Sequence, residues 1–227
     1  MIYDDFINKL NCYLEIYKKG LKKQANAKMK EVVCNLHNTS NGDLDYIMHR
    51  FLSEYCDTSI WNNLKERGNG DIPFALKEFI RIWLTPRCEE KKMPELRWYY
   101  ELYRNDRIGY EFATKYLEYA YLSNECDQKT VDMLFDSYLD TLGWGAHHFP
   151  EVCIIQNNVR EESIKNCEKI MQEKYVTEYL QHRFQYYKIL YNCYDKYKEE
   201  GQKKDFDVYL EEANIDFHYS KSFYYEK

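Results

Sequence analysis

Hydrophobic residues recur every three or four positions along most of the chain, which is the spacing of one face of an α-helix. In LDYIMHRFLSEY, for example, Leu44, Ile47 and Phe51 lie on one such stripe. The chain has only eight glycines and four prolines, so long elements with few interruptions are expected. The pattern predicts an all-α fold of antiparallel helix pairs, arranged either as an α-solenoid or as an irregular helical bundle.

Interruptions of the pattern indicate where helices begin and end. Gly20 is expected to end the first helix. Ser40 and Asp43 approximate a capping box, and Asp127 is a typical N-cap residue. Helices are therefore expected to start just after Ser40 and just after Asp127.

The whole chain, residues 1–227, is expected to form a single helical domain. The segment TPRCEEKKMP, residues 85–94, is predicted to be a connector and is the best candidate for a subdomain boundary. Residues 159–200 contain neither glycine nor proline. That stretch predicts either one very long helix or two helices with a break near Lys174.

The segment LDTLGWGAHHFPEVCII, residues 139–155, follows one of the predicted helices. Gly143 suits the left-handed residue that commonly follows a helix, and Trp144 would then pack back against the last turn in a Schellman-type ending. On this interpretation Trp144 belongs to the core, while His147 and His148 lie in the loop.

The two adjacent histidines also suggest a metal or catalytic site. Neighbours in a helix do not share a face, but in a loop His147 and His148 could act together with Glu151. A metal-dependent or hydrolytic enzyme is therefore one alternative function. The sequence contains no dinucleotide-binding, P-loop, serine-hydrolase or zinc-protease motif, and no C-x-x-C pair. We therefore expect no catalytic residue, no metal and no cofactor.

The net charge of −6 argues against general nucleic-acid binding, which usually needs a basic face. The run KKGLKKQANAKMK, Lys18 to Lys30, is a local exception. It is typical of a solvated helix face, and nucleic-acid binding through it is the second alternative function.

The amino-terminal residues MIYDDFINKL carry two aspartates where a signal peptide needs positive charge, and no apolar run approaches the length of a membrane span. These features predict a cytoplasmic protein that does not bind membranes. The eight cysteines are accordingly expected to be reduced thiols.

Residues 96–122 contain two predicted helices around Gly109, with Ala113, Leu117 and Ala120 spaced for close helix packing. This segment resembles one tetratricopeptide or Sel1-like repeat unit. It departs from the family pattern because Trp98 is one position away from the usual tryptophan and the closing proline is absent. The resemblance implies a scaffold that binds proteins or peptides and has no catalytic activity.

The preferred hypothesis is a non-catalytic cytoplasmic protein that binds a protein or peptide partner and regulates it. A toxin-neutralising immunity protein is one version of that role. The sequence does not indicate an oligomeric state. The tryptophans Trp61, Trp83 and Trp98 lie in apolar helical patterns typical of core positions. The candidate binding residues are Trp98, Tyr99, Tyr103, His147, His148 and Glu151.

Overall fold

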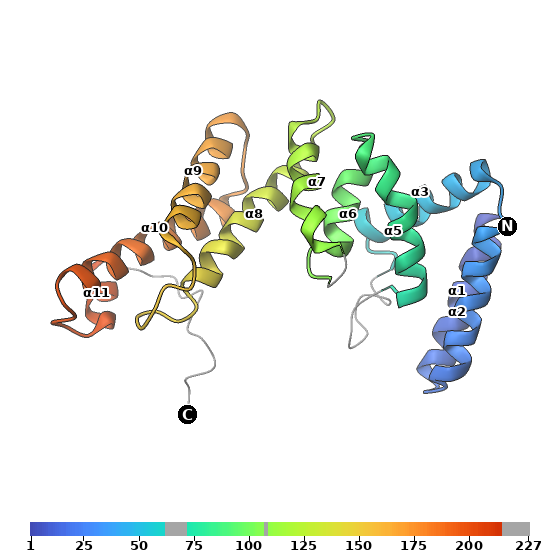
Figure 1. Cartoon of the computed structure of the whole chain (residues 1–227), viewed down its shortest axis with the longest axis horizontal. Coiled ribbons are helices and arrows are strands. Elements are labelled where there is room, and N and C mark those ends of the chain that lie inside the picture. The colour runs from blue at the N-terminus through green and yellow to red at the C-terminus, as the bar shows by residue number, and fades with distance from the viewer. Residues whose placement is uncertain (62–71, 107–108, 215–227) are drawn as a thin grey trace. The chain divides into compact units, whose positions relative to one another are not determined.

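The computed structural model describes residues 1–61, 72–106 and 109–214 (Figure 1). Within these residues the chain forms ten α-helices and no β-strand, so the predicted all-α fold is confirmed. The helices are α1 (Tyr3–Lys18), α2 (Lys22–His37), α3 (Asn41–Asp57), α5 (Phe74–Glu89), α6 (Glu95–Tyr103), α7 (Tyr110–Leu122), α8 (Gln128–Gly145), α9 (Asn157–Glu173), α10 (Glu178–Glu199) and α11 (Phe206–Glu212).

The chain divides into two compact units. Unit 1 comprises Met1–Tyr116 and unit 2 comprises Leu117–Lys227, so that the division falls within α7. The subdomain boundary expected at residues 85–94 lies inside unit 1 and does not coincide with this division.

Helix α5 explains why residues 85–94 do not separate two units. Pro86 lies inside α5, which continues to Glu89. A proline removes one helical hydrogen bond, but Leu84 and Cys88 on either side of it are fully buried and hold the last turn against the core. The connector is therefore shorter than the sequence suggested.

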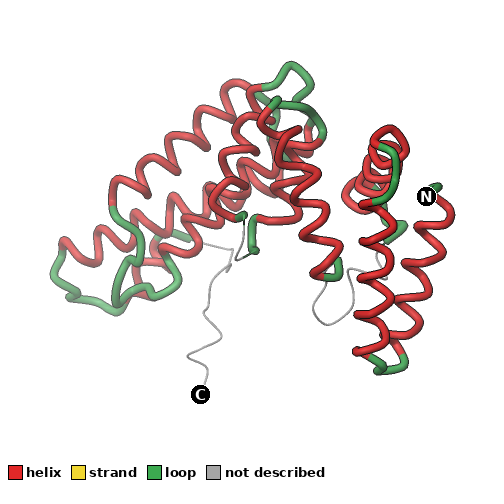
Figure 2. The backbone as a smooth tube through the Cα atoms, turned by 45° about the vertical axis from the view of Figure 1, so that its right-hand side comes forward, coloured by secondary structure: helices red, strands yellow, loops and turns green. Residues whose placement is uncertain are grey.

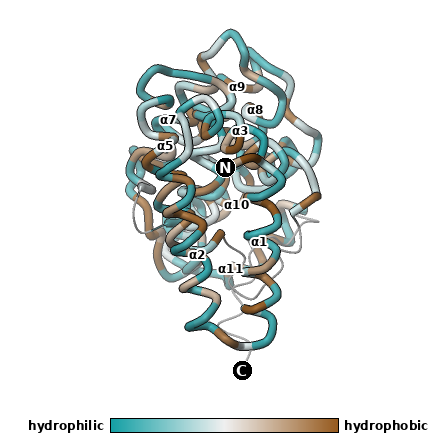
Figure 3. The backbone as a smooth tube through the Cα atoms, turned by 90° about the vertical axis from the view of Figure 1, so that its right-hand side faces the viewer, coloured by the Kyte–Doolittle hydropathy of each residue, from teal (hydrophilic) through white to brown (hydrophobic). Residues whose placement is uncertain are grey.

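In unit 1, α1 and α2 lie side by side as an antiparallel pair (Figure 2). They are joined at Gly20, whose φ of 76° favours glycine, and α1 ends just before it as predicted. Hydrophobic positions recur among polar ones along both helices (Figure 3). Helix α2 packs on α5, α5 packs on α6, and α3 contacts both α1 and α6. Phe6 of α1 meets Phe51 of α3 edge-on at 5.3 Å in this core.

Two predicted helix starts are confirmed by their capping contacts. The Ser40 hydroxyl accepts a hydrogen bond from the backbone N–H of Asp43 at 3.4 Å, and α3 begins at Asn41, directly after Ser40. The Asp127 carboxylate accepts from the backbone N–H of Thr130 at 2.8 Å, and α8 follows. In both cases a side-chain oxygen satisfies an N–H that the helix itself leaves without a partner.

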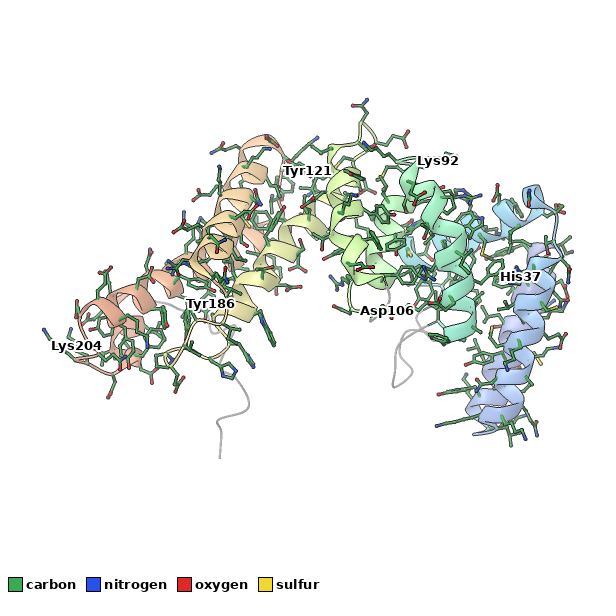
Figure 4. All side chains as sticks on the ribbon, in the orientation of Figure 1. His37, Lys92, Asp106, Tyr121, Tyr186 and Lys204 are labelled. Atoms are coloured by element: carbon green, nitrogen blue, oxygen red, sulfur yellow. The ribbon has the colours of Figure 1, made fainter. Side chains whose placement is uncertain are left out.

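Residues 159–200 form two helices rather than one. Helix α9 ends at Glu173 and α10 begins at Glu178. The break is fixed by contacts with other helices. Tyr121 lies at the end of α7 (Figure 4). Its hydroxyl donates to Glu173 at 2.8 Å. The Thr177 backbone N–H donates to the Asp132 carboxylate of α8 at 3.2 Å. Neighbouring helices thus contact the chain on both sides of the break.

In unit 2, α8 and α10 run in the same direction, with α9 antiparallel to both (Figure 1). Near their N-termini Asp132 of α8 contacts Thr177. Near their C-termini the Tyr191 hydroxyl of α10 donates to the carbonyl oxygen of Leu142 in α8 at 2.9 Å. Two ion pairs link α9 to α10, Lys188–Glu168 at 2.7 Å and Arg160–Asp195 at 2.8 Å.

The helix end predicted at Gly143 is wrong, because α8 continues to Gly145 and Gly143 is not left-handed. Both glycines instead allow another side chain to approach. A Cβ atom at Gly143 would lie 2.6 Å from the Tyr187 hydroxyl, and one at Gly145 would lie 2.6 Å from Ile155 Cδ1. The prediction that Trp144 is a core residue is also wrong, since 62% of its surface is exposed.

Residues 96–122, which resemble a tetratricopeptide unit, form most of α6 and all of α7. Ala113 and Ala120 are fully buried. Tyr99 of α6 contacts Tyr116 of α7 at 4.8 Å, edge to face. The main packing partners of α6 are α5 and α3. The likeness to this repeat family remains a prediction.

Candidate binding surface

Trp144, His147 and His148 form an aromatic group at the C-terminal end of α8, here named the Trp144 cluster. The rings of Trp144 and His147 are stacked, with centroids 5.7 Å apart and planes 8° apart. The His147 ring meets that of His148 edge-on at 4.9 Å. The stacking holds the Trp144 ring in a defined position, and because the side chain is largely exposed, it stays accessible to a partner.

The loop that follows the cluster is anchored to α10. Phe149 stacks on Tyr194 with centroids 4.0 Å apart and planes 3° apart. The Tyr194 hydroxyl accepts from the backbone N–H of Cys153 at 3.1 Å, and the Lys198 ammonium donates to the carbonyl oxygen of Glu151 at 3.0 Å. These contacts pre-position the cluster, so binding would not need to order the loop.

One face of α8 leads from the cluster toward the N-terminus of the helix. Its residues, here named the α8 stripe, recur at intervals of three and four positions, which places them on one side of a helix. The stripe lies opposite the buried residues Val131, Leu134, Phe135, Leu139 and Leu142. It consists of Lys129, Met133, Asp136, Asp140 and Trp144.

A groove lies at the N-terminal end of the stripe, between α8 and α10. Its volume is about 680 Å³. Tyr179 is 60% exposed beside it, while Leu180 is buried at its base. The groove is lined by Gln128, Lys129, Asp132, Met133, Asp136, Thr177, Tyr179, Leu180 and Arg183.

Arg183 of α10 connects the groove to the middle of the stripe. Its guanidinium pairs with Asp136 and, at 3.3 Å, with Asp140. Burial lowers the pKa of Arg183, but the Tyr187 hydrogen bond and the Asp136 charge outweigh burial and raise it above the ordinary value. The Arg183 side chain is 14% exposed, whereas those of Asp136 and Asp140 are 30% and 59% exposed. The surface offered to solvent is therefore acidic even though the charges are paired.

The structure brings together two of the three residues of the predicted metal or hydrolytic site, His147 and His148. The His147 and His148 rings touch each other, and His147 also stacks on Trp144. The observed contact of Glu151 is through its backbone carbonyl to Lys198. Across the described part of the chain, no group of three or more His, Cys, Asp or Glu side chains is placed to hold a metal ion.

The other three predicted binding residues are buried in unit 1. Trp98 and Tyr99 are each 2% exposed and Tyr103 is fully buried. The Trp98 indole N–H donates to Asp57 at 3.0 Å, and the Tyr103 hydroxyl donates to the carbonyl oxygen of Lys77 at 2.6 Å. Burial raises the pKa of Tyr99 to about 12. These side chains pack the core of unit 1 and offer little surface to a partner.

A row of polar residues on α3 faces α5 and α6, and we name it the α3 seam. His49 donates to Glu95 Oε1 at 3.2 Å, and its ring lies edge-on to Trp83 at 5.2 Å and to Trp98 at 5.7 Å. The remaining contacts of the seam are Asp45 with Trp83 and Arg87, and Asp57 with Arg97 and Trp98.

Glu95 is the most buried charge of the seam, at 2% exposure. Its Oε2 atom is buried and has no hydrogen-bond partner within the described residues. Burial raises the pKa of this carboxyl, but hydrogen bonds from His49 and from its own backbone N–H outweigh burial and bring the pKa below its usual value. The Cys88 thiol donates to the Glu95 carbonyl oxygen and is fully buried. Burial also raises its pKa, so it is a poor nucleophile.

A second groove, of about 760 Å³, follows the outer face of α1 in unit 1. At one end the Glu54 carboxylate accepts from the Tyr3 hydroxyl, from Arg50 at 3.1 Å and from the Trp61 indole at 3.4 Å. Elsewhere the groove is lined largely by polar α1 residues such as Asn8. It lacks an exposed aromatic anchor comparable with Trp144 in the described part of the chain.

The basic run from Lys18 to Lys30 covers the end of α1, the turn at Gly20 and the start of α2. Lys19 and Lys23 are exposed in it, and Lys28 pairs with Glu31 at 2.8 Å. This placement agrees with a solvated helix face, and nucleic-acid binding through the run stays a prediction.

Part of the α8 stripe could have been predicted from the spacing of residues in the sequence. Asp140 and Trp144 are four residues apart, so they share a face once α8 is extended to Gly145. Ending the helix before Gly143 concealed that relation. The same spacing argument could not identify Tyr179 and Arg183, because they belong to α10 and lie beside the stripe only where α10 packs on α8.

Within the described residues, no helix is long and apolar enough to cross a membrane. Comparisons of the chain with models of known protein families, with curated proteins and with solved structures give no match.

Proposed function

We propose that this chain is a non-catalytic protein that binds a protein partner through the Trp144 cluster and the α8 stripe. The observation that carries the proposal is the exposure of Trp144, which is fixed by stacking on His147 instead of being buried. Exposed tryptophans on a rigid support are typical of the residues that dominate binding energy at protein interfaces.

Two further observations support a binding role. Helices α8 and α10 run in parallel and place the groove and the cluster at opposite ends of one continuous stripe. The anchored loop after α8 keeps the cluster in place before binding, which lowers the entropy lost on association. Neutralisation of a toxin is one form that such a role would take, and an acidic surface suits a basic toxin.

The proposal is tested by affinity purification from the native cell, comparing the wild-type chain with Trp144→Ala. Phe74→Ala is the matched control, because Phe74 is 72% exposed but belongs to α5 of unit 1. The wild-type chain and the control are expected to recover the same protein in a stable complex, and Trp144→Ala is expected to lose it. Recovery of that protein by all three variants, or by none, would contradict the proposal.

The enzyme alternative is tested by elemental analysis and by unfolding the purified chain in the presence of a chelator. We expect no stoichiometric metal and no change in the unfolding midpoint. A bound metal whose removal lowers the midpoint would favour the metal-dependent alternative over the binding function.

A further inference from the structure

We propose that the α8 stripe binds a basic segment of the partner that carries an apolar side chain at each end. This inference rests on the proposed function and adds the chemistry of the partner. Three features support it: apolar groups at both ends of the stripe, acidic groups between them, and a spacing fixed by α8 itself.

The two apolar ends differ in shape. At the N-terminal end, Met133, Tyr179 and Leu180 line a groove that can receive an aliphatic side chain. At the C-terminal end, Trp144 offers an exposed ring, and Val152, which is 52% exposed, follows the cluster in the loop. The backbone N–H of Val152 donates to the His148 carbonyl oxygen at 3.1 Å, so the valine is held beside the cluster. Each end therefore suits one apolar anchor.

The centre of the stripe is acidic. Among the three side chains Arg183, Asp136 and Asp140, Asp140 is the most exposed and Asp136 is the next. Because Arg183 lies deeper, an approaching side chain meets the two carboxylates first. A lysine or arginine is favoured there, whereas an aspartate or glutamate is repelled.

Trp144 adds a second reason to expect a positive charge. Asp140 lies one helical turn before Trp144 on the same face. A guanidinium or ammonium that pairs with Asp140 is therefore close enough to stack on the indole as well. Cation–π contacts favour tryptophan over the other aromatic residues. Asp140 and Trp144 together thus favour a basic side chain of the partner, next to the apolar side chain that contacts Trp144.

The spacing sets the length of the partner segment. Met133 and Trp144 are eleven residues apart in α8 (144 − 133). At the rise of an α-helix this separation is about 17 Å. An extended chain covers the same distance in roughly five residues. The partner segment therefore has its two apolar anchors about five positions apart, with Lys or Arg between them.

The test uses the full chain and three labelled peptides in a fluorescence anisotropy titration. The first peptide has a leucine and a tryptophan separated by about four Lys and Arg residues, which matches the estimated span. The second has the same anchors separated by Glu, and the third has the basic residues with serines as anchors. We expect the first peptide to bind at least about tenfold more tightly than either of the others. Its affinity should fall as the salt concentration rises.

Matched variants connect the result to the stripe. Trp144→Ala is expected to weaken binding of the first peptide by about tenfold or more, and Asp140→Asn by about three- to tenfold. Asp207→Asn removes an equal charge from an exposed position in α11 and is expected to leave binding unchanged. Circular dichroism confirms that each variant is folded.

Three outcomes would overturn the inference. They are equal binding of the basic and acidic peptides, equal loss of binding in Asp140→Asn and Asp207→Asn, and no binding of any peptide. The proposed function is judged separately by recovery of the native partner. If Trp144→Ala loses that partner while the basic peptide does not bind, the binding function stands and the basic partner is wrong.

Discussion

Helix α3 of unit 1 and helix α8 of unit 2 differ in the contacts that bring their neighbours closest. On α3 a row of polar residues faces α5 and α6, and His49 and Asp57 reach the buried side chains of Glu95 and Arg97. On α8 the closest contacts are made by glycine, since Tyr191 of α10 packs over Gly145. The polar residues Asp136 and Asp140 of its stripe pair with Arg183 of α10 nearer the surface.

This difference shows that the polarity of a residue alone does not tell whether its side of the helix is packed or exposed. A row of polar residues on α3 contacts α5 and α6, while α8 exposes a tryptophan at 62%. Trp98, by contrast, is 2% exposed and donates to a seam carboxylate. A buried charge must have partners to be tolerated, and an exposed tryptophan needs a reason other than core packing. The following substitutions test these two forms of packing.

The largest effect is expected for Arg97→Ala in the α3 seam. Arg97 is 4% exposed and pairs with Asp57 at 2.6 Å and Glu101 at 2.8 Å. Its removal leaves two carboxylates partly buried without this partner, so the free energy of unfolding should fall by about 3–5 kcal/mol. Urea unfolding measures the change. Lys9→Ala, which breaks a more exposed pair with Asp5, serves as the control and should have a smaller effect.

The next largest effect is expected for Gly145→Ala in unit 2. The added Cβ would meet the Tyr191 hydroxyl and the Ile155 side chain, which are packed against α8. Overpacking of this kind should lower the free energy of unfolding by about 1–3 kcal/mol. Gly42→Ala is the control, because no atom lies within 4 Å of its added Cβ. An equal effect of the two substitutions on thermal unfolding would mean that Gly145 is not a packing position.

A smaller, pH-dependent effect is expected for Glu95→Gln. The folded state holds the pKa of Glu95 below its ordinary value, so the ionised carboxylate stabilises the fold above the unfolded-state pKa of about 4.3. That stabilisation is lost as the pH falls through the lower, folded-state pKa. Glu95→Gln should therefore lose more stability relative to the wild type at pH 7 than at pH 3. Urea unfolding across this range measures the difference, and parallel pH profiles would contradict the account.

The smallest effect on stability is expected for Trp144→Ala. Because the side chain is mostly exposed, its removal should change the free energy of unfolding by no more than about 0.5 kcal/mol. The same variant is predicted to lose the binding partner. A large loss of stability would show that Trp144 supports the fold of unit 2. Unfolding of the variant would then explain its loss of binding.

Most of the helices could be predicted from the sequence, because an amphipathic stripe depends on local spacing. The starts of α3 and α8 followed from Ser40 and Asp127, whose side chains cap the next residues in the chain. The end of α8 could not be found in the same way. Gly143 has the residue type of a helix end, but it lies inside the helix, where the Tyr187 side chain of α10 occupies the space that a Cβ atom would fill.

The candidate site could be predicted only in part for the same reason. His147 and His148 follow the end of α8 in a loop segment, as expected, but Trp144, the exposed residue that stacks on His147, was assigned to the core. The groove with Tyr179 and the pairing with Arg183 depend on α10 packing beside α8. No local pattern in the sequence indicates that these two helices are neighbours.

The central claim is that Trp144 is an accessible binding residue, and acrylamide quenching of tryptophan fluorescence tests it most directly. Of the four tryptophans, Trp61, Trp83 and Trp98 are between 2% and 7% exposed, so Trp144 should provide nearly all of the readily quenched emission. We predict that this fraction disappears in Trp144→Phe and becomes protected when the wild-type chain is bound to its recovered partner. Equal quenching of the free and bound wild-type chain would contradict the claim.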